Sequence, residues 1–156
     1  MLSHAQNFED VMLARLFAGQ ATGFYVDVGA SHPSIGSVTK HFYDRGWSGI
    51  NIEPLAGAHA LLLRERPRDV NLHAAAAARR GELRFVEAVD FTGLSTSDAA
   101  QADYLHRRGL ALREHRVAGV SLNDVFDLHV THPVDFLKID AEGGEGPLSV
   151  KAISHR

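Results

Sequence analysis

Short β-branched runs alternate with helical patterns between residues 24 and 73, and this alternation restricts the fold more than any other feature. The runs at 24–29, 49–53 and 70–73 have the length and residue types of buried strands. The segments between them, 38–46 and 56–65, place apolar residues at helical spacing. Strands that alternate with helices form a parallel sheet through right-handed crossovers. The sequence therefore predicts an α/β fold with a mostly parallel sheet and flanking helices.

The same periodicities predict elements on both sides of this alternating core. Residues 7–17 predict a helix with Asn7 as its N-cap, because Phe8, Met12 and Leu16 recur every four residues. We expect residues 1–22 to form a separate N-terminal helical segment. Further along the chain, the patterns predict strands at 82–87, 117–120 and 134–140, and helices at 98–109 and from Ser121 onwards.

Composition excludes several classes of protein. The 156 residues contain no cysteine, so disulfides, thiolate nucleophiles and cysteine-based zinc sites are ruled out. A formal net charge of -3 gives no broad basic face, and we expect no nucleic-acid partner. No run approaches the ~20 apolar residues that cross a bilayer. The N-terminus lacks the basic start and apolar centre of a secretion signal, so we expect a cytoplasmic protein without a membrane partner.

Acidic residues stand at the ends of three predicted strands: Asp27, Glu53 and Asp140. In an open parallel sheet, ligands collect beyond the carboxyl ends of the strands. Glu53 follows Asp27 at about the separation expected for the acid that binds ribose hydroxyls in a nucleotide-binding βαβ unit. Gly29 would let the backbone turn tightly beside such a ligand. These positions predict a nucleotide-type site at one edge of the sheet.

The glycine pattern after the first strand disfavours a dinucleotide. The run Asp-Val-Gly-Ala-Ser-His-Pro at 27–33 lacks the repeated glycines that admit a pyrophosphate. The sequence therefore disfavours a nicotinamide- or flavin-dependent dehydrogenase. A cofactor with a ribose and no phosphates remains suitable.

Four blocks of the sequence resemble the FkbM methyltransferases, a family within the class I, Rossmann-like, S-adenosyl-L-methionine-dependent enzymes. The blocks are AQNFEDVML at 5–13, GFYVDVGA at 23–30, GWSGINIEP at 46–54 and DFLKIDAEG at 135–143, and they occur in the family's order. The resemblance implies a Rossmann-like domain over residues 23–145. It also implies methyl transfer to an oxygen, commonly a hydroxyl on a sugar or secondary metabolite, so the expected partner is a small-molecule or glycan acceptor.

The resemblance further implies a set of site residues. A glycine turn would lie under the methionine part of the cofactor, Glu53 would bind its ribose, and the stretch after the third strand would lie near its adenine. Asp140 would face the sulfonium end. The implied cofactor-binding residues are Asp27, Val28, Gly29, Ala30, Glu53, Pro54, Ala74, Ala75 and Asp140. Candidate catalytic bases are Asp140, Glu142 and His32, with Asp140 ranked first, because all three would lie on loops at the same edge.

Alternatives remain open at the C-terminal end. Asp140 and Glu142 could bind Mg²⁺ through carboxylate oxygens, but such a pair at a turn is more often solvated, so no metal is assigned. The tail at 146–156 does not match the family pattern, and we expect the second half of the usual methyltransferase sheet to be missing. The exposed edge would then permit self-association. The alternative function is a catalytically inactive, truncated remnant that keeps a nucleotide-type pocket or serves as an interaction module.

Overall fold

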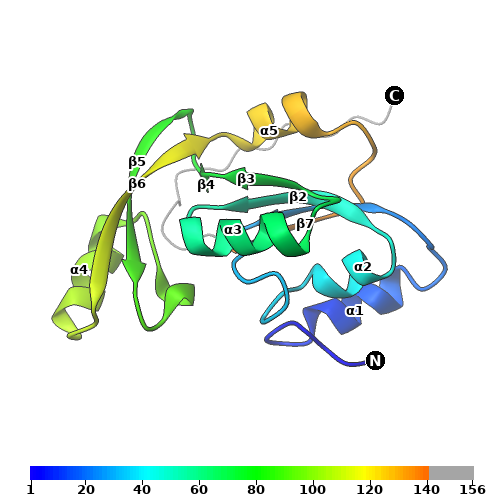
Figure 1. Cartoon of the computed structure of the whole chain (residues 1–156), viewed down its shortest axis with the longest axis horizontal. Coiled ribbons are helices and arrows are strands. Elements are labelled where there is room, and N and C mark those ends of the chain that lie inside the picture. The colour runs from blue at the N-terminus through cyan, green and yellow to red at the C-terminus, as the bar shows by residue number, and fades with distance from the viewer. Residues whose placement is uncertain (141–156) are drawn as a thin grey trace.

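The chain forms two β-sheets, seen in the computed structural model of Figure 1, which describes residues 1–140. The first sheet has four parallel strands in the order β3-β2-β1-β7. Its strands are β1 (Phe24–Val28), β2 (Ser48–Glu53), β3 (Val70–His73) and β7 (Phe136–Ile139). The second sheet has the order β4-β6-β5, with β4 (Ala75–Ala76), β5 (Gly81–Ala88) and β6 (Leu112–Val120).

Helices cover both faces of the parallel sheet. One face carries α1 (Glu9–Leu16), α2 (Lys40–Asp44) and α3 (Ala56–Glu65), and the opposite face carries α5 (Leu122–His129) (Figure 1). The segment between β5 and β6 holds the short 3₁₀ helix η1 (Thr92–Leu94) and helix α4 (Ala99–Arg107). This arrangement confirms the predicted α/β fold, a Rossmann-like, mostly parallel sheet with flanking helices.

Alternation along β1 and β2 divides the core into two layers, because successive side chains of a strand point to opposite faces of the sheet. Val26 and Ile50 pack with Leu122 of α5 in one apolar cluster. Tyr25 packs with Phe42 and Trp47 in an aromatic cluster on the other face. Both layers leave the carboxyl ends of the strands free to form a site.

The N-terminal helix differs from its prediction at its start. Helix α1 begins at Glu9, and Phe8 rather than Asn7 stands at the N-cap position, with a left-handed φ of 62°. Asn7 instead donates to the Glu9 carboxylate from its backbone nitrogen at 3.0 Å and from its side chain at 3.1 Å. The predicted apolar face, formed by Phe8, Met12 and Leu16, is exposed. Leu13 and Phe17 make the contact with the aromatic cluster, because a helical period fixes which residues share a face but not which face is covered.

The second sheet was only partly predicted. Strand β6 begins at Leu112, five residues before the predicted strand, and pairs antiparallel with β5 from Leu112 to Gly119. The alanine run after β3 forms the short strand β4, in which Ala75 pairs with Gly119. Alanine is depleted in strands, and the first half of β6 is rich in charged residues, so neither segment has a strand-like pattern.

The edges of the parallel sheet are formed by β3 and β7 within residues 1–140. Strand β7 pairs with β1 from Tyr25↔Phe136 to Val28↔Ile139, which sets Asp140 beside the end of β1. The tail at 146–156 lies outside the described residues. The domain boundaries at residues 22 and 145, and self-association through an uncovered edge, stay predictions.

Candidate functional site

A pocket lies beyond the carboxyl ends of β1 and β2, between the two sheets. It holds about 700 Å³ of space not filled by protein atoms, including open solvent at its mouth. Ligand sites of α/β proteins occur at this edge of the sheet and combine apolar walls with a few polar groups. The lining residues are Val28, Gly29, Ser31, Ile52, Glu53, Pro54, Leu55, Ala74, Ala75, Ala76, Phe85, Thr92, Gly93, Ser95, Ser97 and Asp140.

The turn after β1 forms one side of this pocket. Gly29 has a φ of +71° and Ser31 a φ of 54°, both in the left-handed region. The amides of Gly29 and Ala30 donate to the carbonyl of Ile52 at 2.9 and 3.2 Å, which ties the turn to the neighbouring strand β2. A Cβ added at Gly29 would lie 1.9 Å from the backbone oxygen of Asp140. Glycine is therefore required here by its positive φ and by the close approach of the chain after β7.

Glu53 joins the turn after β1 to the start of α3. Its side chain is buried, and its two carboxylate oxygens accept from the backbone amides of Ser31 and Leu55, each at 2.7 Å. Burial raises the pKa of Glu53, while these two hydrogen bonds and the charge of Lys138 act in the opposite direction. Each carboxylate oxygen has a second lone pair, so Glu53 can still accept from ligand hydroxyls.

Asp27 lies beneath the pocket rather than in its lining. Its side chain is 1% exposed, and Oδ2 accepts from the Thr39 hydroxyl at 3.0 Å. Oδ1 lies 3.1 Å from Lys138 Nζ, an ion pair whose angles do not meet those of a hydrogen bond. Ala30 is also buried outside the lining. The structure thus brings neither of these two predicted cofactor contacts to the pocket surface.

Lys138 does not line the pocket, but it contacts the turn at Gly29, which does, and the sequence reasoning missed it. Its ammonium donates to the Gly29 carbonyl at 2.7 Å and lies 3.7 Å from Asp140 Oδ2. The side chain is 18% exposed. A lysine inside the otherwise apolar run Phe-Leu-Lys-Ile is the sequence signal that could have identified it, because a cation in an apolar strand needs partners.

The remaining predicted residues divide between the pocket and its surroundings. Val28, Pro54, Ala74, Ala75 and Asp140 line the pocket, as the resemblance implies. His32 is not part of the lining. Its Nδ1 accepts from the amides of Ser34 and Ile35, both at 3.1 Å, which stabilises the loop after the turn. Glu142 lies outside the described residues.

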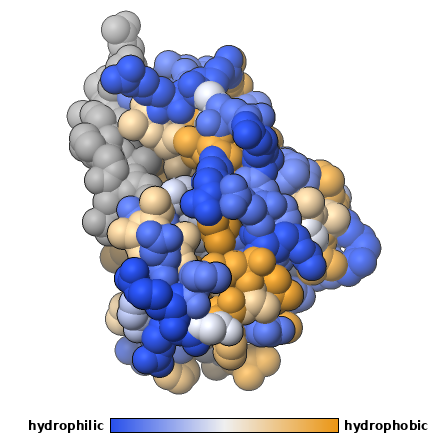
Figure 2. Space-filling model, turned by 90° about the vertical axis from the view of Figure 1, so that its left-hand side faces the viewer, coloured by the Kyte–Doolittle hydropathy of each residue, from blue (hydrophilic) through white to orange (hydrophobic). Residues whose placement is uncertain are grey.

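The second sheet supplies a wall that was not predicted. Its lining residues come from β4, β5 and the segment around η1, and they include Phe85 and several hydroxyl side chains. Figure 2 views the molecule from the outer side of the second sheet, the left-hand side of Figure 1, and shows hydrophobic surface among hydrophilic residues. Phe91 and Leu94, in the same segment as η1, are exposed apolar residues. The strand pairing that brings this wall to the pocket is not visible in the sequence.

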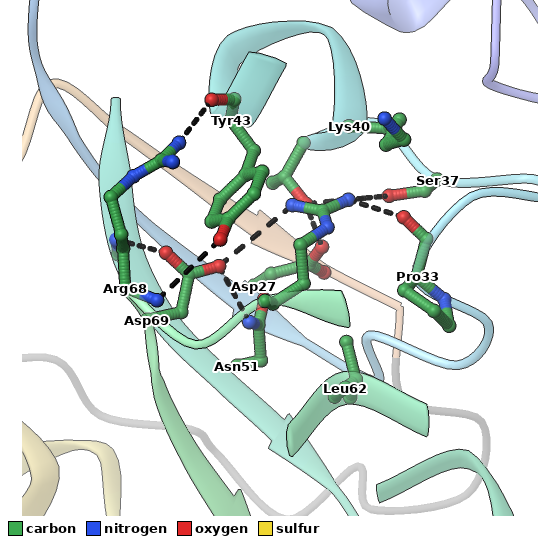
Figure 3. Close-up of polar contacts among 12 residues, drawn as sticks. Asp27, Pro33, Ser37, Lys40, Tyr43, Asn51, Leu62, Arg68 and Asp69 are labelled. Atoms are coloured by element: carbon green, nitrogen blue, oxygen red, sulfur yellow. Dashed lines mark hydrogen bonds and ion pairs between the residues drawn. The ribbon is translucent and has the colours of Figure 1, made fainter. Parts of the chain in front are cut away.

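A buried polar network supports the loop after the turn from beneath (Figure 3). Arg66, at the end of α3, is 1% exposed and donates to the Ser37 hydroxyl at 3.1 Å and to the carbonyl of Pro33. It also donates to the Tyr25 hydroxyl at 3.2 Å, and that hydroxyl donates to Asp69 at 2.7 Å. Burial raises the pKa of Asp69, opposed mainly by its hydrogen bond from Tyr25. The network anchors the loop to both α3 and the sheet.

Neither a metal cluster nor a membrane span is found in the described part of the chain. Among residues 1–140, no group of three or more His, Cys, Asp or Glu side chains could hold a metal ion. In the same residues, no helix is long and apolar enough to cross a bilayer. A cytoplasmic location stays a prediction.

The fold defines a Rossmann-like α/β protein with a pocket where its parallel strands end. Over residues 27–148, the chain matches the family model described as the methyltransferase FkbM domain, and it belongs to that family. Comparisons with curated proteins and with solved structures gave no match. The family membership confirms the recognition made from the four sequence blocks, and it makes methyltransferase the class of this chain.

Proposed function

We propose that this protein transfers a methyl group from S-adenosyl-L-methionine to a hydroxyl of a small-molecule or glycan acceptor. The family match supports methyl transfer in general. The observation that carries the proposal is the buried carboxylate of Glu53 in the wall of a pocket at the ends of β1 and β2. A carboxylate in this position suits a ribose, since it can accept from both ribose hydroxyls.

The chemistry of the lining fits the cofactor. Glu53 would hold the ribose, and the small apolar side chains of Ala74 and Ala75 would lie beside the adenine. The turn at Gly29 would lie under the methionine part, with the carboxylate of Asp140 near the positive sulfonium. When bound, the cofactor supplies an electrophilic methyl group for in-line displacement. The protein contributes orientation, which is worth up to ~7–11 kcal/mol in ideal cases.

Asp140 is the candidate base that the structure supports best. Its side chain is 68% exposed and lines the pocket, so it can meet an acceptor hydroxyl. The Nδ1 of His32 is used by two backbone amides, and that residue does not line the pocket. If the acceptor hydroxyl must lose its proton early, the carboxylate of Asp140 would accept that proton as the oxygen attacks the methyl group.

Titration of the purified protein with S-adenosyl-L-methionine by calorimetry tests the cofactor assignment. Glu53→Ala should weaken binding by roughly 1–3 kcal/mol, because a desolvated ribose contact is lost. Glu114→Ala is the matched control, since Glu114 is an exposed carboxylate on β6 outside the pocket lining. Thermal denaturation of both variants checks that they fold. Equal affinity of wild type and a folded Glu53→Ala protein would refute the ribose role.

A methyl-release assay over candidate hydroxyl acceptors then tests turnover. Release that depends on both acceptor and Asp140 supports the transferase. Cofactor binding without turnover of any acceptor would instead support the alternative, an inactive remnant that keeps its nucleotide-type pocket.

A further inference from the structure

The ammonium of Lys138 contacts the turn after β1, where it also lies 3.5 Å from the Val28 carbonyl oxygen, and two carboxylates, of which only Asp140 lines the pocket. Nζ lies 2.7 Å from the Gly29 carbonyl oxygen, 3.1 Å from Asp27 Oδ1 and 3.7 Å from Asp140 Oδ2. Strand pairing explains the ion pair between Lys138 and Asp27, because the two residues are directly opposite each other on β7 and β1. The cation thus lies between a buried carboxylate and a carboxylate that faces the pocket.

These contacts reach two parts of the pocket wall, the turn at Gly29 and the carboxylate of Asp140. The turn at Gly29 has a left-handed backbone, and a charge-assisted hydrogen bond to its carbonyl fixes the peptide plane. Asp140 follows the last residue of β7, and its carboxylate is mostly exposed. An exposed carboxylate has many rotamers, so a nearby cation restricts where its charge lies.

We propose that Lys138 is a positioning residue for the cofactor. Its ammonium sets the turn at Gly29 and the carboxylate of Asp140 in the arrangement that binds S-adenosyl-L-methionine. Asp27 is the buried counter-charge that holds the ammonium in place, rather than a direct contact of the cofactor. The inference rests on the proposed function for the identity of the ligand.

A double variant separates positioning from simple charge balance. Lys138→Met alone leaves Asp27 buried without the ammonium opposite it, which is strongly unfavourable for an ionised carboxylate. Asp27→Asn combined with Lys138→Met removes one charge of each sign, so the net charge is unchanged and no buried ion is left alone. The amide introduced at position 27 still offers an oxygen to the Thr39 hydroxyl.

The expected results differ for a positioning role and a structural one. We expect the double variant to recover most of the thermal stability lost in Lys138→Met, yet to bind S-adenosyl-L-methionine roughly tenfold to a hundredfold more weakly than wild type. Asp27→Asn alone keeps the ammonium but removes its buried counter-charge, so its affinity should fall between that of wild type and that of the double variant. Lys138→Arg should retain more affinity than Lys138→Met. Recovery of both stability and affinity in the double variant would overturn the proposal.

The matched control is an ion pair of the second sheet. Arg84 and Glu114 pair at 2.7 Å on exposed faces of β5 and β6, and neither lines the pocket. The double variant Arg84→Met with Glu114→Gln should leave cofactor affinity unchanged.

Hydrogen exchange tests the positioning role without the cofactor. The amides of Gly29 and Asp140 donate to Ile52 and Val28 at 2.9 and 3.0 Å, and both bonds lie next to the ammonium. In the Asp27→Asn, Lys138→Met protein we expect these amides to exchange at least about fivefold faster than in wild type, with the β2–β3 amides unchanged. Failure of wild type to bind S-adenosyl-L-methionine would refute the proposed function alone. Unchanged exchange at these two amides would refute the role of Lys138.

Discussion

Substitution of Gly29 by alanine should disturb both the stability of the protein and its pocket. The left-handed φ of +71° costs a residue with a Cβ about 1–2 kcal/mol. The added Cβ would also lie 1.9 Å from the backbone oxygen of Asp140, so the chain after β7 must move away. That movement breaks the hydrogen bond from the Asp140 amide to Val28, worth about 0.5–1.5 kcal/mol. The expected loss is about 1.5–3.5 kcal/mol, or roughly 3–14 °C in Tm for a chain of this size.

Gly109→Ala is a matched control for the cost of placing a residue with a Cβ in the left-handed backbone region. Gly109 has a similar φ of +76°, but a Cβ there would meet nothing within 4 Å. Thermal denaturation of the two variants should therefore show a larger loss for Gly29→Ala, and the difference measures the close approach to Asp140. Calorimetry with S-adenosyl-L-methionine should show weakened binding for Gly29→Ala alone. Equal losses of stability in the two variants would refute the argument from the close approach.

Two further predictions concern buried charges. Burial raises the pKa of Glu53, so its contribution to stability is present at low pH and is lost as the pH rises through the folded-state pKa. The Tm of Glu53→Gln relative to wild type should therefore increase between about pH 4 and pH 8. A Tm difference that stays flat or falls over this pH series would contradict the raised pKa. Arg66→Met leaves Asp69 buried without its cationic partner and should lower the free energy of unfolding by about 3–5 kcal/mol in urea titrations. The exposed Arg64 on the same helix is the control, since Arg64→Met should change stability by at most about 0.5 kcal/mol. Similar losses in the two variants would show that Arg66 does not stabilise the protein by balancing the buried charge of Asp69.

Local patterns were sufficient to predict the elements of the parallel sheet. Helix α3 and strand β3 occupy the predicted bounds, 56–65 and 70–73, because each has a clean period and a clear boundary residue. The N-cap prediction at Asn7 was wrong, because an amide side chain near a helix start can equally bond to the acid that follows it. The second sheet was poorly predicted since its pairing joins Ala75 to Gly119, far apart in the sequence.

The candidate site was predictable where it depends on a single strand end. Glu53 and Gly29 follow directly from strand ends and turn chemistry, and both line the pocket. Asp27 fits the same sequence pattern but lies beneath the pocket, since its neighbour on β7 is a lysine that draws its carboxylate into an ion pair. Such a pairing depends on strand order, which a pattern of residues along one chain does not contain.

The chain enters and leaves the second sheet at neighbouring points. It enters at β4 and leaves at the end of β6, and Ala76 pairs directly with Val120. A segment whose two ends lie side by side can be lengthened, shortened or exchanged while the strands before and after it keep their places. Because this segment forms one wall of the pocket, evolution can alter that wall independently of the strand ends that carry Gly29 and Glu53. Grafting the corresponding segment between members of the family would accordingly change the shape of this wall while leaving the parallel sheet in place.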